Sequence, residues 1–242
     1  MILQCLGSSS SGNCYIIGND IEAIILEAGK TITLAKVKQA LNFNIRKVKA
    51  VLISHLHDDH AGRAKEYECV FPTYSNRSVI EAKRLTHTTE IFAGKSFFVG
   101  GFKILPFLAD HDVPCFGFII QHQEIGNMLF LTDSASCDYE FKNLNHIMIE
   151  CNFSRDILTQ SVENGLHPSV AKRVNDTHME LNTCKRALQN QDLSNVYNIV
   201  LLHLSNNNSD ADQFKEVLSK ATGKPIQIAE SGFEVEIINK PF

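Results

Sequence analysis

The segment VLISHLHDDHAG, residues 51–62, joins a run of aliphatic side chains to three histidines and two aspartates within six positions. The aliphatic residues predict a buried strand, and ligands collect at the carboxyl ends of strands in open α/β sheets. His55 and His57 stand two apart on extended or turning backbone and can converge on one cation. Asp59 and His60 come one turn later and face a neighbouring position. The loop therefore predicts half-sites for two metal ions about 3.5 to 4 Å apart.

Each half-site is incomplete, because a catalytic zinc takes about three protein ligands and keeps a place open for water. Three further candidates end apolar strands downstream: His111 follows FKILPF, Asp133 follows MLFLT and His203 follows NIVLL. A single histidine or aspartate at a strand end is more often a capping or hydrogen-bonded residue than a ligand. Together with the first cluster, however, these three residues are better explained as metal ligands than as capping residues. The sequence therefore predicts a metal site. Its candidate ligands are His55, His57, Asp59, His60, His111, Asp133 and His203.

Strand-like and helical segments alternate along the 242 residues, with no change of composition that would mark a linker. Helices are expected in TITLAKVKQALNF, SNRSVIEAKRL, HMELNTCKRALQ and SDADQFKEVLSKATG, and strands in most apolar runs between them. The polar, poorly periodic stretch from Asn152 to Asp176 is expected to be loop with some helix. This pattern suggests two sheets back to back with helices outside, in a single domain over residues 1–242.

Composition excludes several classes of protein. The formal net charge is −4, whereas nucleic-acid binders usually display a basic domain or stripe. Residues 28–57 nevertheless hold six basic side chains and no acid, which fits either a solvated helix face or a patch for a phosphate backbone.

The seven cysteines are scattered and never form a C-x-x-C pair, so reduced thiols are expected. With no long apolar run and no leader at Met1, we expect a cytoplasmic protein with no membrane contact.

The order H-x-H-x-D-H, followed by His, Asp and His, resembles the metallo-β-lactamase-fold hydrolase superfamily over essentially the whole chain. The resemblance implies an α/β fold, a four-layer αβ/βα sandwich of two mixed sheets with helices on the outer faces. It also implies a binuclear metal centre. One metal ion would be held by His55, His57 and His111, the other by Asp59, His60 and His203, and both would be bridged by Asp133.

Weaker features resemble one branch of the superfamily. The segments GSSSSGNCYII, ADHDVP and LLHLSNNNSDADQFKEVLSKATGKPI are similar to the YycJ/WalJ-like branch, which is related to tRNase Z and to small phosphodiesterases. DTHMELNTCKRAL resembles a helix start that places a histidine near the scissile phosphate, although Met179 stands where Ser or Thr is usual. This implies a proton-donating role for His178, whose alternative role is a hydrogen bond to nearby backbone. Glu27 replaces the usual strand-end aspartate and is expected to support the loop rather than bind metal.

The expected activity is that of a binuclear-metal-dependent hydrolase, most simply a phosphodiesterase or nuclease resembling a DNA exonuclease. Two cations would share a water, lower its pKa toward neutrality from about 15.7, and supply a bridging hydroxide for in-line attack on phosphorus. The candidate catalytic residues are Asp59, Asp133 and His178. Five histidines favour Zn²⁺ as the divalent metal, and two carboxylates keep Mn²⁺ open. The partner is then a nucleic acid or another phosphodiester substrate.

Substrate contacts are less specific. Small residues in the Ser8–Asn13 loop let backbone amides approach an anion, so Ser10 and Asn13 are candidates, although a plain hairpin turn explains the loop equally well. Asn152 and Arg155 are phosphate-contact candidates, with a surface loop as the alternative. No long RNA-gripping insertion is evident. A glyoxalase II-like thioesterase, a cyclic phosphodiesterase and a noncatalytic metal-binding scaffold remain alternative functions, and the sequence gives no indication of oligomeric state.

Overall fold

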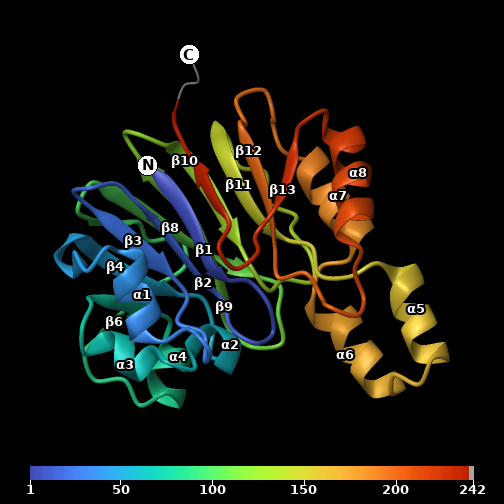
Figure 1. Cartoon of the computed structure of the whole chain (residues 1–242), viewed down its shortest axis with the longest axis horizontal. Helices are drawn as coiled ribbons and strands as arrows, with labels where there is room; N and C mark the ends of the chain where they lie inside the picture. The colour runs from blue at the N-terminus through green and yellow to red at the C-terminus, as the bar shows by residue number, and fades with distance from the viewer. Residues whose placement is uncertain (240–242) are drawn as a thin grey trace.

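Two seven-stranded sheets lie face to face at the centre of the computed structural model, which describes residues 1–239 (Figure 1). The first sheet has the strand order β14 (Glu234–Glu236), β1 (Ile2–Gly7), β2 (Cys14–Gly18), β3 (Ala23–Leu26), β4 (Val48–Ile53), β5 (Thr73–Ser75) and β6 (Thr88–Glu90). Strands β14 to β3 pair antiparallel, and β3 to β6 pair parallel. This sheet is therefore mixed, as the resemblance implied.

The second sheet is mixed as well. Its strand order is β13 (Ile226–Ile228), β12 (Asn198–Leu202), β11 (Leu144–Glu150), β10 (Gly126–Leu131), β9 (Cys115–His122), β8 (Phe102–Ala109) and β7 (Phe97–Val99). Strands β13 to β10 pair parallel, and β10 to β7 pair antiparallel. Because β8 and β10 both lie antiparallel to β9, they run in the same direction. The carboxyl ends of β8, β10, β11 and β12 therefore meet at one edge, which is where the sequence predicted the ligands.

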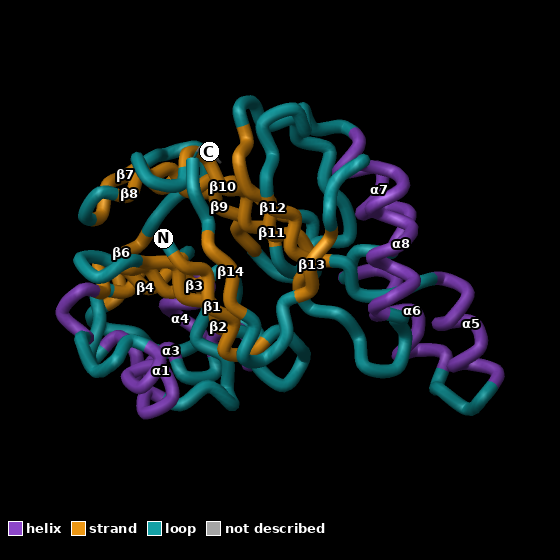
Figure 2. Tube along the Cα trace, turned by 45° about the horizontal axis from the view of Figure 1, so that its top comes forward, coloured by secondary structure: helices purple, strands orange, loops and turns teal. Residues whose placement is uncertain are grey.

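Helices cover the outer faces of the two sheets (Figures 1 and 2). Beside the first sheet lie α1 (Leu34–Ala40), α2 (Asp58–Ala61), α3 (Ala64–Glu68), α4 (Arg77–Ala82) and a short 3₁₀ helix (Ile45–Lys47). Beside the second lie α7 (Leu181–Gln189) and α8 (Ala211–Thr222). These layers confirm the predicted four-layer α/β sandwich. Within the described residues, no helix is both long and apolar enough to cross a membrane.

Three apolar clusters hold these layers together. Along β3, Ile24 and Leu26 pack into the cluster between the two sheets, while Ile25 packs into the cluster under the helices of the first sheet. The third cluster joins the second sheet to α7 and α8. Each fully buried isoleucine or leucine contributes about 1.5 to 3 kcal/mol relative to an exposed one. Burial on both faces explains why these strands appear in the sequence as continuous apolar runs.

Local signals fix several helix ends as predicted. The side chain of Thr33 accepts a hydrogen bond from the Lys36 amide at the start of α1, and Asp210 accepts from two amides at the start of α8. Helix α8 ends at Gly223, whose φ of 67° is a left-handed conformation that glycine adopts without strain. The short strands β5 and β6 were not predicted, because three residues carry too little periodicity to be recognised.

The expectation for residues 152–176 was wrong in part. Most of this stretch forms two helices, α5 (Arg155–Glu163) and α6 (Pro168–Thr177), which extend to one side of the molecule (Figures 1 and 2). Ser154 caps α5, and Pro168 begins α6 at a position that proline favours. Their shared apolar cluster is small, which is why the sequence has weak helical periodicity there.

Candidate metal centre

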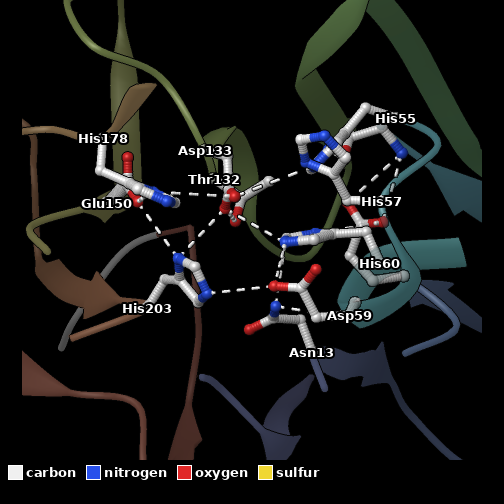
Figure 3. A network of polar contacts seen from close by, with 12 residues as sticks. Asn13, His55, His57, Asp59, His60, Thr132, Asp133, Glu150, His178 and His203 are labelled. Carbon is white, nitrogen blue, oxygen red and sulfur yellow. Dashed lines mark hydrogen bonds and ion pairs between the residues drawn. The ribbon is translucent and has the colours of Figure 1, made fainter. Parts of the chain in front are cut away.

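The first half-site gathers three imidazoles from two strand ends. His55 and His57 follow β4, and His111 follows β8. His57 Nδ1 lies 3.1 Å from His55 Nε2 and 3.3 Å from His111 Nε2. Asp133 Oδ2 lies 3.9 Å from His55 Nε2 and 4.0 Å from His111 Nε2. The ligand atoms of these four side chains all lie within 4.8 Å of one another. Figure 3 shows three of the four, His55, His57 and Asp133.

The second half-site lies beside the first (Figure 3). Asp59 and His60 belong to α2, and His203 follows β12. His60 Nε2 lies 3.1 Å from Asp133 Oδ1 and 3.5 Å from Asp59 Oδ2. His203 Nε2 lies 3.4 Å from Asp59 Oδ2. Asp133 belongs to both sets, with one carboxylate oxygen toward each.

These distances fit a divalent metal. Four ligands placed tetrahedrally about 2.05 Å from a zinc ion are about 3.3 Å from one another, and the nearer nitrogen pairs match that spacing. His203 Nε2 is also buried and has no hydrogen-bond partner among the described residues. A buried nitrogen without a partner destabilises the fold. Because Nε2 faces Asp59, a metal ion held between the two would satisfy it. The seven predicted ligands therefore lie together as two sets that could each hold a cation.

Backbone hydrogen bonds from neighbouring loops fix the ligand loop. The amide of Asn13 donates to the Asp59 carbonyl at 2.7 Å, and the amide of Ala28 donates to the His60 carbonyl at 2.7 Å. Gly29 lies directly between these partners, and a side chain there would collide with Asn13 N and Asp59 O. The close approach of the three loops therefore requires glycine at this position.

Glu27 contacts this loop, in keeping with the supporting role that the resemblance implied. Its carboxylate accepts from the Ser54 amide at 3.3 Å and lies 3.6 Å from His60 Nδ1. Glu27 is fully buried and has a positive φ of 70°. It faces the ring nitrogen of His60 that points away from the second half-site, so it orients the imidazole.

Carboxylates dominate the electrostatics of the centre. Burial alone would raise the pKa of Asp133, but His203 and His60 outweigh it and hold that pKa well below its usual range. Burial also opposes protonation of His203, yet Asp133, Asp59 and Glu150 raise its pKa to about 10. For His55, burial and the neighbouring His60 lower the pKa. The centre therefore keeps its carboxylates ionised and attracts positive charge.

Glu150 was missed by the sequence analysis. It ends β11, is fully buried, and accepts from the amides of Ser134 at 2.9 Å and Met179 at 3.0 Å. His178 Nδ1 lies 2.6 Å from its carboxylate, and His203 Nδ1 lies 3.2 Å from it (Figure 3). The signal was available, because Glu150 ends an apolar strand just as Asp133 does. The structure thus places His178 beside the centre and provides it with a carboxylate partner.

The four candidate substrate contacts fall into two groups. Asn13 Nδ2 lies 2.9 Å from His60 Nε2, and Asn152 Nδ2 donates to the His203 carbonyl at 2.7 Å. Both amides are buried against the ligand loops. Ser10 and Arg155 are exposed, on the β1–β2 loop and at the start of α5. The two asparagines therefore hold ligand loops in place, whereas the exposed pair is free to meet a substrate.

The basic stretch from residue 28 to 57 is divided between two ends of the first sheet. Lys47 Nζ donates to the Asn19 carbonyl, at the end of β2 opposite the metal centre. Lys49 lies near Gly100, at the same far end. Lys36 Nζ instead donates to the Leu6 carbonyl, on the strand that leads to the Ser8–Asn13 loop. The six basic residues therefore do not form one continuous track beside the centre.

Residues 9–113 match the model of the metallo-beta-lactamase superfamily. This segment contains the first ligand cluster and His111. A comparison with curated proteins finds no match.

Solved structures with the same fold cover nearly the whole chain. The metallo-beta-lactamase fold protein YhfI from Bacillus subtilis is 18% identical, with a TM-score of 0.72 over 97% of this chain and 98% of its own. A diphosphatase of the PhnP family is 15% identical, with a TM-score of 0.67 over 98% and 97%. The short form of human tRNase Z is 14% identical, with a TM-score of 0.60 over 98% and 99%. At these identities the likeness shows the fold alone. The chain therefore has the metallo-beta-lactamase fold, and its residues 9–113 match the superfamily model.

Proposed function

We propose that this protein is a binuclear-metal-dependent phosphodiesterase, acting as a single domain over residues 1–242 and related to the YycJ/WalJ-like branch. The observation that carries the proposal is the position of Asp133, whose two carboxylate oxygens face two separate sets of nitrogen and oxygen ligands. Ligands spaced in this way suit two ions held a few ångströms apart. The structural likeness to a diphosphatase and to tRNase Z is consistent with a phosphate ester as substrate.

His55, His57 and His111 would hold one ion, and Asp59, His60 and His203 the other. When bound, two divalent cations lower the pKa of water and offset negative charge on phosphate oxygens. Five imidazoles among the ligands favour zinc, while the two carboxylates also suit manganese. The protein supplies the fixed geometry, because the ligand loops are anchored to buried backbone at several points.

His178 would donate the proton that the leaving oxygen requires. Burial lowers its pKa, but the carboxylate of Glu150 outweighs that effect and raises it, which favours the protonated imidazole more than in a free histidine. The 2.6 Å contact with Glu150 also fixes the ring, leaving Nε2 as the nitrogen available to a substrate. A raised pKa favours the proton-carrying form that general acid catalysis needs.

The test is turnover by the purified full-length protein with zinc or manganese added, on bis-p-nitrophenyl phosphate, labelled DNA, labelled RNA and a thioester. We expect the phosphodiesters to be cleaved and the thioester to be spared. Cleavage of the thioester alone would replace the proposal with a glyoxalase II-like activity. No turnover on any of the four, with both ions bound, would favour a noncatalytic scaffold.

Two ligand variants and one matched control assign the activity to the centre. His57→Ala and Asp59→Ala each remove one ligand from a different half-site and should abolish phosphodiester turnover. His87→Ala removes an exposed histidine outside both sets and should retain it. Circular dichroism of all three should match the unaltered protein. Wild-type rates in both ligand variants would refute the assignment.

A further inference from the structure

A groove begins beside the second half-site and leads away from it. Its first cavity, of about 390 Å³, is lined by Ser8 and Ser9 of the β1–β2 loop and by Leu204, Ser205 and Asn206 of the loop after β12. The groove adjoins the centre directly: the His203 amide donates to Ser8 Oγ at 2.8 Å, and Leu204 is the residue after His203. The lining of this cavity is therefore joined to the backbone of His203 through Ser8 and Leu204.

The groove then extends along the edge of the second sheet. A second cavity, of about 610 Å³, lies between β13, α8 and the β13–β14 turn. The two cavities share Ile228, Glu230 and Ser231, so they are neighbours, and together they are called the groove. Pockets of about 300 to 1,000 Å³ hold molecules the size of a drug or a nucleoside. A lone methyl or nitrophenyl ester would leave most of this space empty.

Hydroxyl and amide groups line the first cavity, and two lysines border the groove. Lys36 Nζ donates to Ser231 Oγ at 3.2 Å, where the two cavities meet. Lys36 Nζ also donates to the Leu6 carbonyl, and no carboxylate of the described chain lies within ion-pairing distance of it, so its charge is not neutralised. Lys215 lines the second cavity, and its nearest acid is the exposed Asp212 at 3.7 Å. Glu230 is the carboxylate that opposes these two lysines.

We propose that this groove binds the phosphodiester backbone of a single-stranded oligonucleotide, beyond the phosphate held at the metal centre. The inference rests on the proposed phosphodiesterase function and deepens it from phosphodiesters in general to a nucleic acid chain. Lys36 contacts a backbone phosphate one or two units from the cleavage site, and the serine hydroxyls and Asn206 donate to sugar or phosphate oxygens. Of the basic residues in the stretch from 28 to 57, Lys36 is therefore the one that contacts the polymer, whereas Lys47 lies at the far end of the sheet.

The test measures binding of fluorescein-labelled, cleavage-resistant phosphorothioate chains to the zinc-loaded full-length protein. Chains of two and twelve deoxythymidines and of two and twelve uridines are compared by fluorescence anisotropy. We expect the twelve-residue chains to bind at least about tenfold more tightly than the two-residue chains. The preference between the two sugars identifies DNA or RNA as the source of the backbone.

Two variants probe the groove, each with a neighbouring control. Lys36→Ala should weaken binding of the twelve-residue chain about five- to tenfold and reduce the salt dependence by about 0.7 in log–log slope, the loss of one single-strand phosphate contact. Asn206→Trp should fill the first cavity and weaken binding at least about tenfold. Lys36 contacts Ser231, which lines both cavities, and Asn206 lines the first. Lys38→Ala and Asn207→Trp alter their neighbours, which line neither cavity, and these variants should bind as the unaltered protein does.

The outcomes distinguish a failure of the groove inference from a failure of the proposed phosphodiesterase function. Turnover of bis-p-nitrophenyl phosphate combined with equal binding of short and long chains would overturn the inference and leave the proposed function standing. Unchanged binding by Lys36→Ala and Asn206→Trp would also overturn it. Selective loss of long-chain binding in these two variants supports it, even if the assayed diesters are not cleaved and the proposed function fails.

Discussion

His203 and His146 are equally buried, at 1% exposure each, yet their pKa values move in opposite directions. At the metal centre, Asp133, Asp59 and Glu150 outweigh burial and raise the pKa of His203 to about 10. His146 lies at the start of β11, at the opposite edge of the second sheet, where burial lowers its pKa to about 4. No carboxylate of the described chain pairs with it, and Asn198 Nδ2 lies 3.1 Å from its Nδ1. Neighbouring charge, rather than burial, therefore separates a cation-binding cluster from a structural histidine.

The largest effect is expected from neutralising the shared carboxylate. Asp133→Asn removes the negative charge that faces both half-sites, so we expect kcat/KM on bis-p-nitrophenyl phosphate to fall about 10³-fold, or about 4 kcal/mol. The measurement is steady-state kinetics at saturating zinc. Retention of more than a tenth of the activity would mean that Asp133 does not join the two sets.

Metal ions should replace protons at the centre and stabilise the fold. At a metal concentration 100 to 1,000 times Kd, binding adds about 2.7 to 4.1 kcal/mol to the free energy of unfolding, which raises Tm by roughly 5 to 15 °C in a chain of this size. Thermal unfolding with zinc and with excess chelator measures the difference. Asp133→Asn should show little shift, and an equally large shift in that variant would place the stabilising metal elsewhere.

Glu150→Gln tests the effect of carboxylate charge on the histidines of the centre. The variant removes one charge and keeps a hydrogen-bond acceptor for the Ser134 and Met179 amides. We expect kcat to fall about 10- to 100-fold, the usual cost of losing a partner that orients a functional group. Because Glu150 raises the pKa of His178, activity that requires protonated His178 is lost as pH rises through that pKa. In the variant this alkaline limb should move to lower pH. An unmoved limb would contradict the proton-donating role of His178.

The smallest effect is expected at His146, the buried histidine without a carboxylate partner, and it is an effect on the free energy of unfolding. Its folded-state pKa of about 4 lies below the ordinary value of 6.5, so its contribution to stability is present above about pH 6.5 and is lost as pH falls toward 4. Between pH 7 and pH 5 the loss is about 2 kcal/mol. Urea unfolding of wild type and His146→Gln at both pH values measures it, with exposed His87→Gln as control. Equal pH dependence in all three would show that His146 is not the titrating group.

Much of this molecule could be predicted from sequence because its signals are local. A strand end followed by H-x-H-x-D-H and three later strand-end residues was enough to predict the converging ligands, since parallel strand ends meet at one edge. Thr33, Asp210 and Gly223 marked helix ends through single side chains or a single backbone angle.

Other features depend on contacts between distant residues and were missed. Glu150 ends an apolar strand as Asp133 does, but its role as the partner of His178, 28 positions later, follows only from their contact in the fold. The helices α5 and α6 bury few apolar side chains, so their sequence lacks a strong period. The groove beside His203 is formed by the β1–β2 loop, the loop after β12 and the β13–β14 turn, whose proximity no local pattern encodes.

The most direct test of the two-ion centre is elemental analysis of protein reconstituted with zinc and freed of excess by gel filtration. The account predicts about two zinc ions per chain in the unaltered protein, and about one or fewer in His57→Ala and in Asp59→Ala. Less than about 0.2 ions per chain in the unaltered protein, or two ions retained in both variants, would contradict it.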